Sequence, residues 1–384
     1  MKNKAFILSI GFAMFSMFFG SGNLVFPVMV GQLSEGHYAF AALGIFLTGV
    51  LVPFLGAITM LLFQGKSDNF FGVLGKKAGF LIPLFTLSLL GPFGVLARCT
   101  TVAHASFSRL FPQVDLYSFS AVFCIIILLS IIRKSRVVTL VGSILTPILL
   151  ISLMFIAYFG LKDAHFPQIE IEGRFQAFSH GIFQGYQTMD LLAAFFFSSF
   201  VLQHIRQRNF SEENLEENQS QLFKAALTAS MVGMGILTFV YYLLVLLGAS
   251  YAPLLKSVPP ERMLGVIAEQ ALGPYGVWIV CLAVVVACFT TAAVLTSLFA
   301  DFIKTRLCLD KISNFQSIFI TLSLTFLTST LEFHGIAAFL TPILETIYPA
   351  LIILTLLNLL NKLRGMKVLK WPILLALLFR IFAS

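Results

Sequence analysis

The sequence predicts an all-α polytopic membrane protein with a core of two inverted five-helix repeats, and three observations lead to this fold class. Hydrophobic residues make up 58% of the 384-residue chain and charged residues only 11%, and its mean hydropathy is +0.95. So few charges could not cover the surface of a soluble domain. The apolar residues also fall into eleven stretches that could cross a bilayer. Finally, two of these stretches, five apart, contain glycine-rich polar interruptions.

The eleven expected spans belong to a single transmembrane domain that covers residues 1–384. Repeat one comprises the first five spans (5–160), repeat two the next five (177–360), and an extra helix (368–382) follows. In order, the spans are expected at 5–32, 38–63, 79–108, 117–134, 137–160, 177–204, 223–249, 274–303, 314–331, 335–360 and 368–382.

Two connecting segments are expected to hold short helices. In the loop 206–222, Ser211 precedes Glu212 and Glu213, and acidic residues suit the positive end of a helix. We therefore expect a surface helix that leads into the seventh span. The mixed pattern of residues 259–272 predicts a short extracellular helix over the bundle.

The basic residues indicate how the chain is oriented. With the N-terminus in the cytoplasm, 18 of the 25 Lys and Arg residues lie in inner loops, six lie outside and Arg98 lies within a span. This asymmetry agrees with the positive-inside rule. It also accounts for the net charge of +8 by membrane orientation, so membrane lipid is an expected partner and nucleic acid is not.

The first interruption, Gly20-Ser21-Gly22-Asn23-Leu24, lies inside residues 5–32. An unpaired backbone group in lipid costs several kcal/mol, so such a break is tolerated only where it is buried or lines a cavity. A half-helix that begins near Val25 would offer N–H groups to a carboxylate, while carbonyls near Phe19 would suit a cation or an ammonium group. A small-residue helix-packing motif remains the alternative interpretation.

The second interruption, Gly185-Tyr186-Gln187-Thr188-Met189-Asp190, lies inside residues 177–204. An ionised Asp at the membrane centre costs about 2.5–3.5 kcal/mol, so Asp190 is expected to cap the following half-helix or to face a cation. Tyr186 and Thr188 could contact a ligand or could be core residues with satisfied hydroxyls. Breaks in corresponding spans of two repeats are typical of secondary transporters with a midplane site.

A third motif, Ala287-Cys288-Phe289-Thr290-Thr291, lies in the span 274–303. Its two hydroxyls and the carbonyl of Ala287 are hard oxygen donors, which could complete a sodium site with carbonyls of the first half-helix. By itself the motif is a weak signal, because Thr often bonds back to its own helix.

Two further charged residues, Arg98 and Glu345, fall inside the spans 79–108 and 335–360. A charge unpaired in hydrocarbon is costly. Arg98 is therefore expected to pair with Glu345 or with Asp190, either as a gate or as a structural brace.

Together with the stretch Gly91-Pro92-Phe93-Gly94-Val95-Leu96-Ala97-Arg98, these motifs resemble, in order, those of the bacterial branched-chain amino acid transport system carriers. Those carriers are leucine/isoleucine/valine:cation symporters thought to have the LeuT-type fold. The resemblance covers nearly the whole chain. It implies import of Leu, Ile or Val across the bacterial inner membrane by cation symport, with sodium as the expected coupling ion and no other cofactor.

The resemblance also implies which residues form the site. Substrate contacts are implied for Gly20, Ser21, Gly22, Asn23, Gly185, Tyr186, Gln187 and Thr188. Sodium ligands are implied for Ala287, Thr290 and Thr291 and for backbone oxygens near Ser16 and Phe19. The chain departs from the family twice: it has eleven expected spans where the family usually has twelve, and Leu96-Ala97 stands where Ile-Pro is usual, which predicts a straighter third span.

Other functions remain open at this stage. Within the same class, the carrier could be proton-coupled or could select a different amino acid, because one methylene changes binding by only about 1–3 kcal/mol. An intramembrane lipid-modifying enzyme is a distant alternative, but the sequence shows no cluster of carboxylates or histidines at one membrane face. The five cysteines have no paired spacing that would indicate a disulfide or a metal site.

Overall fold

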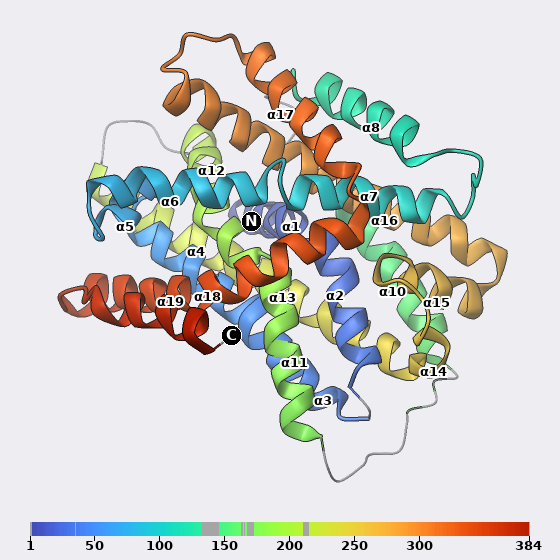
Figure 1. Cartoon of the computed structure of the whole chain (residues 1–384). Helices are drawn as coiled ribbons and strands as arrows, with labels where there is room; N and C mark the ends of the chain where they lie inside the picture. Colours follow the sequence, from blue (N-terminus) through green and yellow to red (C-terminus); the bar gives the residue numbers. More distant parts are fainter. Residues whose placement is uncertain are drawn as a thin grey trace.

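The structure is a computed structural model in which helices are the regular secondary structure over the residues described (Figure 1). No strand occurs among them, which confirms the all-α class. The residues described are 2–34, 36–132, 146–162, 164, 166, 173–209 and 215–383.

Helices occupy all eleven expected positions, although residues 137–145 of the fifth span lie outside the part that the structure describes. The first repeat holds α1 (Lys2–Phe18), α2 (Ser21–Gln32), α3 (Tyr38–Phe46), α4 (Val52–Leu62), α6 (Lys76–Leu90), α7 (Val95–Phe107), α8 (Leu116–Ile131) and α10 (Thr146–Lys162). The second repeat holds α11 (Arg174–Gln187), α12 (Asp190–Asn209), α13 (Leu215–Ser250), α16 (Pro274–Phe302), α17 (Asn314–Ser329) and α18 (Glu332–Arg364), and α19 (Trp371–Ala383) follows. Short helices α5 (Ser67–Gly72), α14 (Ala252–Leu255) and α15 (Met263–Leu272) lie between these spans.

The spans differ in length more than the sequence suggests. Among the described residues, five helices are long and apolar enough to cross a membrane alone, or six when the bent pair α1–α2 is counted as one span. Helices α8 and α17 have 16 residues each, or about 24 Å at 1.5 Å per residue. This is shorter than the roughly 30 Å hydrocarbon core.

Each broken span packs on the second span of the other repeat. Helices α1 and α2 pack along α13, and α11 and α12 pack along α3 and α4. A Cβ added at Gly31 would lie 2.0 Å from the carbonyl oxygen of Val245, and one at Gly181 would lie 2.2 Å from that of Ala41. Glycine is therefore required where these backbones touch. Because each broken span packs on a span of the other repeat, the two breaks lie next to each other at the centre.

The third span is interrupted as well, which the sequence did not predict. Helix α6 ends at Leu90, a turn follows over residues 91–94, and α7 begins at Val95. A Cβ at Gly94 would lie 2.1 Å from the carbonyl oxygen of Leu89, so the turn depends on this glycine. The turn precedes the Leu96-Ala97 pair, and residues 76–107 still form one candidate span that is not among those bent by more than 40°. The straighter third span therefore stays a prediction.

The two connecting segments gave different results. Residues 260–272 form a 3₁₀ turn and then α15, which packs on α16 and α10 and confirms a short helix there. The predicted helix start at Ser211 lies outside the described residues. From Leu215 onward the chain already belongs to α13, so residues 215–222 extend the seventh span and do not form a separate helix.

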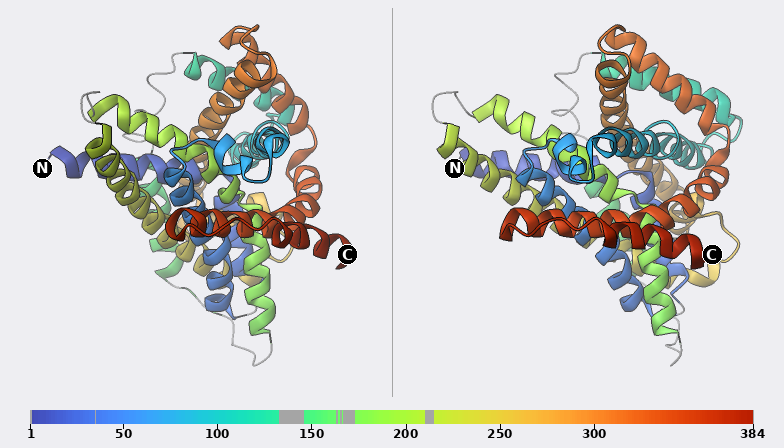
Figure 2. Two further views of the ribbon diagram at one scale, coloured as in Figure 1. Left: turned by 90° about the vertical axis from the view of Figure 1, so that its left-hand side faces the viewer. Right: turned by 60° about the vertical axis from the view of Figure 1, so that its left-hand side comes forward.

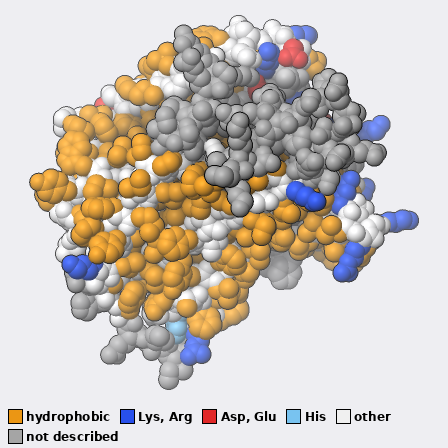
Figure 3. All heavy atoms as spheres, turned by 180° about the vertical axis from the view of Figure 1, so that it is seen from behind, with side chains coloured by type: hydrophobic (Ala, Val, Ile, Leu, Met, Phe, Trp, Pro, Cys, Tyr) orange, Lys and Arg blue, Asp and Glu red, His pale blue; other side chains and the backbone are white. Residues whose placement is uncertain are grey.

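The outer surface is apolar where a bilayer would contact it. Leu129 on α8 is 66% exposed and Ile151 on α10 is 68% exposed. Figure 3 shows hydrophobic side chains over the middle of one face, with Lys and Arg side chains at its margins. At the C-terminal end, α19 folds back along α18 (Figure 2). Exposed apolar side chains of this kind are what lipid-facing helices require.

Candidate functional site

The first break is a sharp bend between two half-helices. Helices α1 and α2 meet at 72°, and the backbone N–H of Gly20 donates to the side-chain Oδ1 of Asn23 at 3.2 Å. A Cβ added at Gly20 would lie 2.9 Å from the Thr291 hydroxyl. The break thus requires glycine because α16 passes directly beside its backbone.

The second break is tighter and lacks a glycine at its turning point. Helix α11 ends at Gln187, α12 begins at Asp190, and Met189 between them has φ +62°. A left-handed conformation at a non-glycine residue costs on the order of 1–3 kcal/mol. Met189 is fully buried, so packing of its side chain maintains this conformation.

The two breaks meet through the side chain of Asn23. Its Nδ2 donates to Asp190 Oδ2 at 2.7 Å and to the hydroxyl of Tyr241 at 2.6 Å. The Tyr241 hydroxyl in turn donates to Asp190 Oδ2 at 3.0 Å. The three side chains come from α2, α12 and α13 and are all buried. They form a polar triad that joins the start of α2 to the start of α12.

The orientation of the Asn23 amide follows from its neighbours. The backbone nitrogen of Gly20 can only donate, so the Asn23 atom that faces it must be the oxygen. The NH₂ group is then the part of Asn23 that faces Asp190. Asp190 Oδ2 is therefore held by two neutral donors.

The two buried charges lie at helix ends of opposite sign. Arg98 is fully buried, and its Nη2 donates to the carbonyl of Gln187, the last residue of α11, at 2.9 Å. Asp190 is the first residue of α12. A cation is favourable at a helix C-terminus and an anion at a helix N-terminus, so each charge is stabilised by the half-helix that it meets.

The direct hydrogen bonds of Arg98 and Asp190 do not join the two side chains, although their charges attract each other through space. The expected pairing of Arg98 therefore stays a prediction. The hydrogen bonds of Arg98 and Asp190 run to Gln187, Asn23 and Tyr241. Glu345 is only half-buried, so its charge does not require burial against Arg98. The charge-neutralising partners are helix ends, which a search of the sequence for opposite charges could not reveal.

Part of the hydrogen-bonding capacity of the Arg98 guanidinium is unused. Its Nε and Nη1 atoms have no hydrogen-bond partner, and neither do the hydroxyl of Tyr348 and Oε1 of Gln187. The guanidinium carbon lies 5.3 Å from the ring centroid of Phe26, within the range of a cation–π contact. Arg98 therefore braces the end of α11 against α2.

The predicted sodium ligands come together only in part. The Thr291 hydroxyl lies 3.5 Å from the carbonyl oxygens of Ser16 and Met17, while the Thr290 hydroxyl donates to the carbonyl of its own helix at Ala287. The hydroxyl of Ser16 is buried and has no partner. Oxygens of α1 and α16 thus face each other beside the first break, with Met17 as a residue that the sequence did not indicate. Phe19 is fully buried next to this point.

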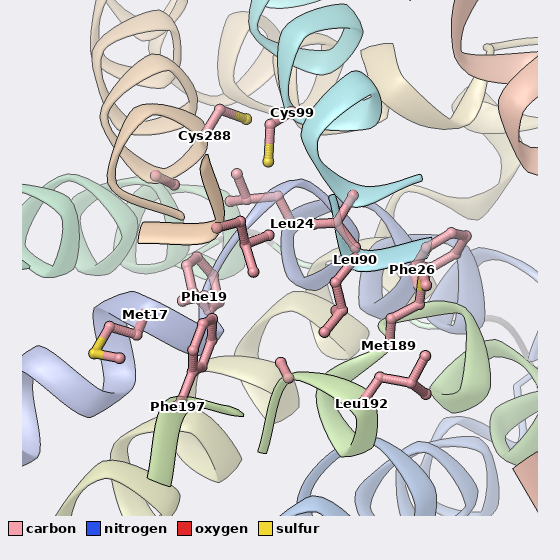
Figure 4. Close-up of a cluster of buried hydrophobic side chains, with 14 of the residues drawn as sticks. Met17, Phe19, Leu24, Phe26, Leu90, Cys99, Met189, Leu192, Phe197 and Cys288 are labelled. Carbon is pink, nitrogen blue, oxygen red and sulfur yellow. The ribbon is translucent and has the colours of Figure 1, made fainter. Parts of the chain in front are cut away.

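A small cavity lies between the two breaks. It measures about 10 Å³, which is room for about one water molecule. Gly20, Asn23, Thr188, Asp190 and Thr291 line it on the polar side. The apolar side is formed by Met17, Phe18, Leu90, Val95, Met189, Ala193, Phe197 and Leu295. Figure 4 shows Phe19, Met189, Leu192 and Phe197 among the buried apolar side chains at this place.

The other predicted substrate residues lie around the cavity without lining it. Ser21 accepts a hydrogen bond from the Cys99 thiol at 3.6 Å, and Gly22 lies against the backbone of Thr188. Gly185 packs on Thr48. The ring of Tyr186 stacks 4.8 Å from that of Tyr348, and the Gln187 amide donates to Thr341.

Sequence reasoning missed Tyr241, Met17 and the apolar lining. Tyr241 lies in an unbroken apolar span, where nothing separates it from other membrane tyrosines. In the described residues, no group of three or more His, Cys, Asp or Glu side chains could hold a metal ion.

Comparison with known proteins adds family and fold. Residues 3–384 match the model of a family described as branched-chain amino acid transport protein. A protein named as a branched-chain amino acid carrier from Staphylococcus haemolyticus is 28% identical over 377 residues, covering 92% of this chain and 81% of that one. One so named from Staphylococcus aureus (strain bovine RF122 / ET3-1) is 27% identical over 378 residues, with the same coverage.

Among solved structures, the fold is similar to that of LeuT-type transporters. Mhp1, a nucleobase-cation-symport-1 family transporter in a closed conformation, superposes with a TM-score of 0.64 at 14% identity, covering 98% of this chain and 91% of that one. MhsT in complex with L-phenylalanine gives 0.60 at 15% identity, covering 97% and 96%. This likeness confirms the inverted-repeat fold expected from the two breaks.

Proposed function

Since the chain belongs to the branched-chain amino acid transport protein family, we propose that this multi-pass secondary transporter imports leucine, isoleucine and valine by sodium symport with alternating access. Like its relatives and structural neighbours, it is a transporter and not an enzyme. The observation that carries the proposal is the meeting of two broken helices, through Asn23 and Asp190, beside a buried cavity.

The start of α2 is suited to the substrate carboxylate. Gly20 precedes the first turn of α2 and has no side chain to cap its N–H groups. The first N–H groups of a helix lack intrahelical partners and carry the positive end of its dipole. An anion at this position would gain both, as phosphates and carboxylates do at other helix N-termini.

The apolar wall of the cavity is suited to an aliphatic side chain. Phe18 and Phe197 make an edge-to-face contact with ring centroids 5.3 Å apart, and Ala193 lies one turn before Phe197 on α12. Small and large apolar residues together leave room for a branched side chain once the helices separate. Because the cavity is smaller than leucine, alternating access requires the helices around it to move.

The sodium site is proposed between α1 and α16. The Thr291 hydroxyl and the carbonyls of Ser16 and Met17 supply oxygens, and the end of a half-helix is the usual place for a coupling ion in this kind of transporter. Ala287, Thr290 and Phe19 are the further candidate ligands. We place the N-terminus in the cytoplasm and the protein in the bacterial inner membrane, on the distribution of its basic residues.

Uptake into proteoliposomes tests the proposal. An inward sodium gradient should drive accumulation of labelled leucine, and unlabelled isoleucine and valine should compete. Thr291→Val should raise the sodium concentration for half-maximal uptake by about tenfold, since it removes one oxygen ligand. Thr325→Val is the matched control, because Thr325 is a buried threonine of α17 that donates to its own helix.

Two outcomes would contradict parts of the proposal. If leucine uptake is independent of sodium and is driven by a pH gradient, the coupling ion is a proton and not sodium. Absence of leucine uptake under either gradient, with uptake of another amino acid, would reassign the substrate.

A further inference from the structure

Asp190 is the single charged side chain among the residues that line the cavity between the two breaks. It is 2% exposed, and its Oδ2 is held by Asn23 and Tyr241, which are both neutral. The titratable groups around it are Arg98 of α7, which hydrogen-bonds to Gln187, and the buried tyrosines Tyr241 and Tyr348. The hydrogen bonds of Asp190 thus leave its charge without a directly bonded cation.

We propose that Asp190 anchors the α-ammonium group of the substrate, so that the free amino group is what the carrier recognises alongside the carboxylate and the side chain. This inference rests on the proposed function and assigns to Asp190 a substrate contact beyond its position at the start of α12.

The N–H groups at the start of α2 and the carboxylate of Asp190 are close enough for one amino acid to contact both. In an α-amino acid the ammonium nitrogen and the carboxylate carbon are bonded to the same carbon, about 2.5 Å apart. A site for this group must present N–H donors and a carboxylate within a few ångströms of each other. Asn23 links the two groups. Its backbone belongs to the first turn of α2, and its side-chain amide donates to Asp190 at 2.7 Å.

The orientation of Asn23 favours an ammonium group over a metal ion at Asp190. The amide oxygen of Asn23 is occupied by the N–H of Gly20, and its NH₂ group faces the carboxylate. A metal ion would need oxygen lone pairs on that side, whereas an ammonium donor needs only the carboxylate. The oxygens suited to sodium lie instead between α1 and α16, at Ser16, Met17 and Thr291.

The test is competition against labelled leucine bound to the purified full-length transporter. Two competitors each lack one charged group: 2-hydroxyisocaproate has a hydroxyl in place of the ammonium, and leucinamide lacks the carboxylate. The native protein should bind leucine at least 100-fold more tightly than either analogue. In Asp190→Asn, the preference for leucine over the hydroxy acid should fall to within about threefold, while the preference over leucinamide persists.

Tyr241→Phe is the matched variant for a role in positioning alone, because it removes a donor to the same carboxylate and keeps the charge. It should weaken leucine and the hydroxy acid by similar factors and leave their ratio unchanged. Thermal unfolding of each variant, with and without leucine, establishes that the protein is folded.

Three results would overturn the inference. If Asp190→Asn keeps the full preference for leucine over the hydroxy acid, Asp190 does not contact the amino group. If the variant keeps leucine counterflow but loses pH-dependent accumulation, Asp190 carries a proton and not the substrate. If it is folded and weakens all three ligands equally, its role is structural. Failure of the native protein to bind leucine at all would contradict the proposed function instead.

Discussion

The two broken helices of this transporter are interrupted by different kinds of residues. In the first break, the turn is made by Gly20, and its polar groups are neutral. In the second, the turn is made by a strained methionine, and charged side chains lie at both helix ends: Arg98 at the end of α11 and Asp190 at the start of α12.

This difference suggests two roles: the end of α11 is stabilised by the protein's own charge, whereas the starts of α2 and α12 are proposed to bind the substrate. The end of α11 receives a permanent cation from another span, so that part of the second break is satisfied by the protein itself. The start of α2 receives no cation or anion from another span by direct hydrogen bond, and in the proposed function its N–H groups bind the substrate carboxylate. We expect substitutions at the end of α11 to reduce folding stability first, and substitutions at the starts of α2 and α12 to reduce transport first.

The largest effect is expected for Arg98→Met. This change removes the charge and the hydrogen bond that cap α11, and it leaves Asp190 without a nearby cation. The expected loss of folding stability is roughly 3 kcal/mol, measured by thermal unfolding in detergent, with uptake lost in parallel. Arg98→Lys keeps the charge and should recover part of the stability. Normal stability in Arg98→Met would show that the second break needs no cation.

Asn23→Ala should affect transport more than folding. It removes one hydrogen bond from the Gly20 N–H, which keeps the Phe18 carbonyl, and one from the Asp190 carboxylate, which keeps Tyr241. Each lost hydrogen bond is worth about 0.5–1.5 kcal/mol. Leucine affinity should fall 10- to 100-fold while the unfolding temperature changes little. A large fall in unfolding temperature would mean that the first break is as structural as the second.

Gly20→Ala tests whether the first break tolerates a side chain. The added Cβ would lie 2.9 Å from the Thr291 hydroxyl, and the displacement of Thr291 should weaken sodium dependence about fivefold, given a cost near 1 kcal/mol. The half-maximal sodium concentration for leucine uptake is the measurement. Gly235→Ala is the control, because an added Cβ there meets nothing within 4 Å.

Tyr241→Phe should have an effect as small as that of Gly20→Ala. It removes one neutral donor to Asp190 from a carboxylate that retains Asn23, which corresponds to about 1 kcal/mol, or a three- to tenfold loss of leucine affinity. An effect as large as that of Asn23→Ala would mean that the triad acts as one unit and that the contrast between the two breaks is weaker than its geometry suggests.

Some features of the site could be read from residue order and others could not. Gly20 and Asn23 were recognisable because polar, glycine-rich segments are rare inside apolar spans. The turn at residues 91–94 was missed, although it contains Gly91 and Gly94, because the surrounding apolar run is long enough for an unbroken helix. The role of Tyr241 depends on which side of α13 faces the breaks, and an apolar helix that is buried on several sides gives no periodic signal for this.

By itself, the sequence determined the all-helical membrane fold and the two breaks at its centre, because apolar length and unpaired backbone in lipid are properties of local composition. Only the tertiary structure decided which groups neutralise the buried charges. Arg98 and Asp190 lie 92 residues apart, and each meets a helix end brought to it by the packing of the two repeats. Contacts of this kind depend on where backbone segments lie in space, and residue types alone do not encode them in any recognisable pattern.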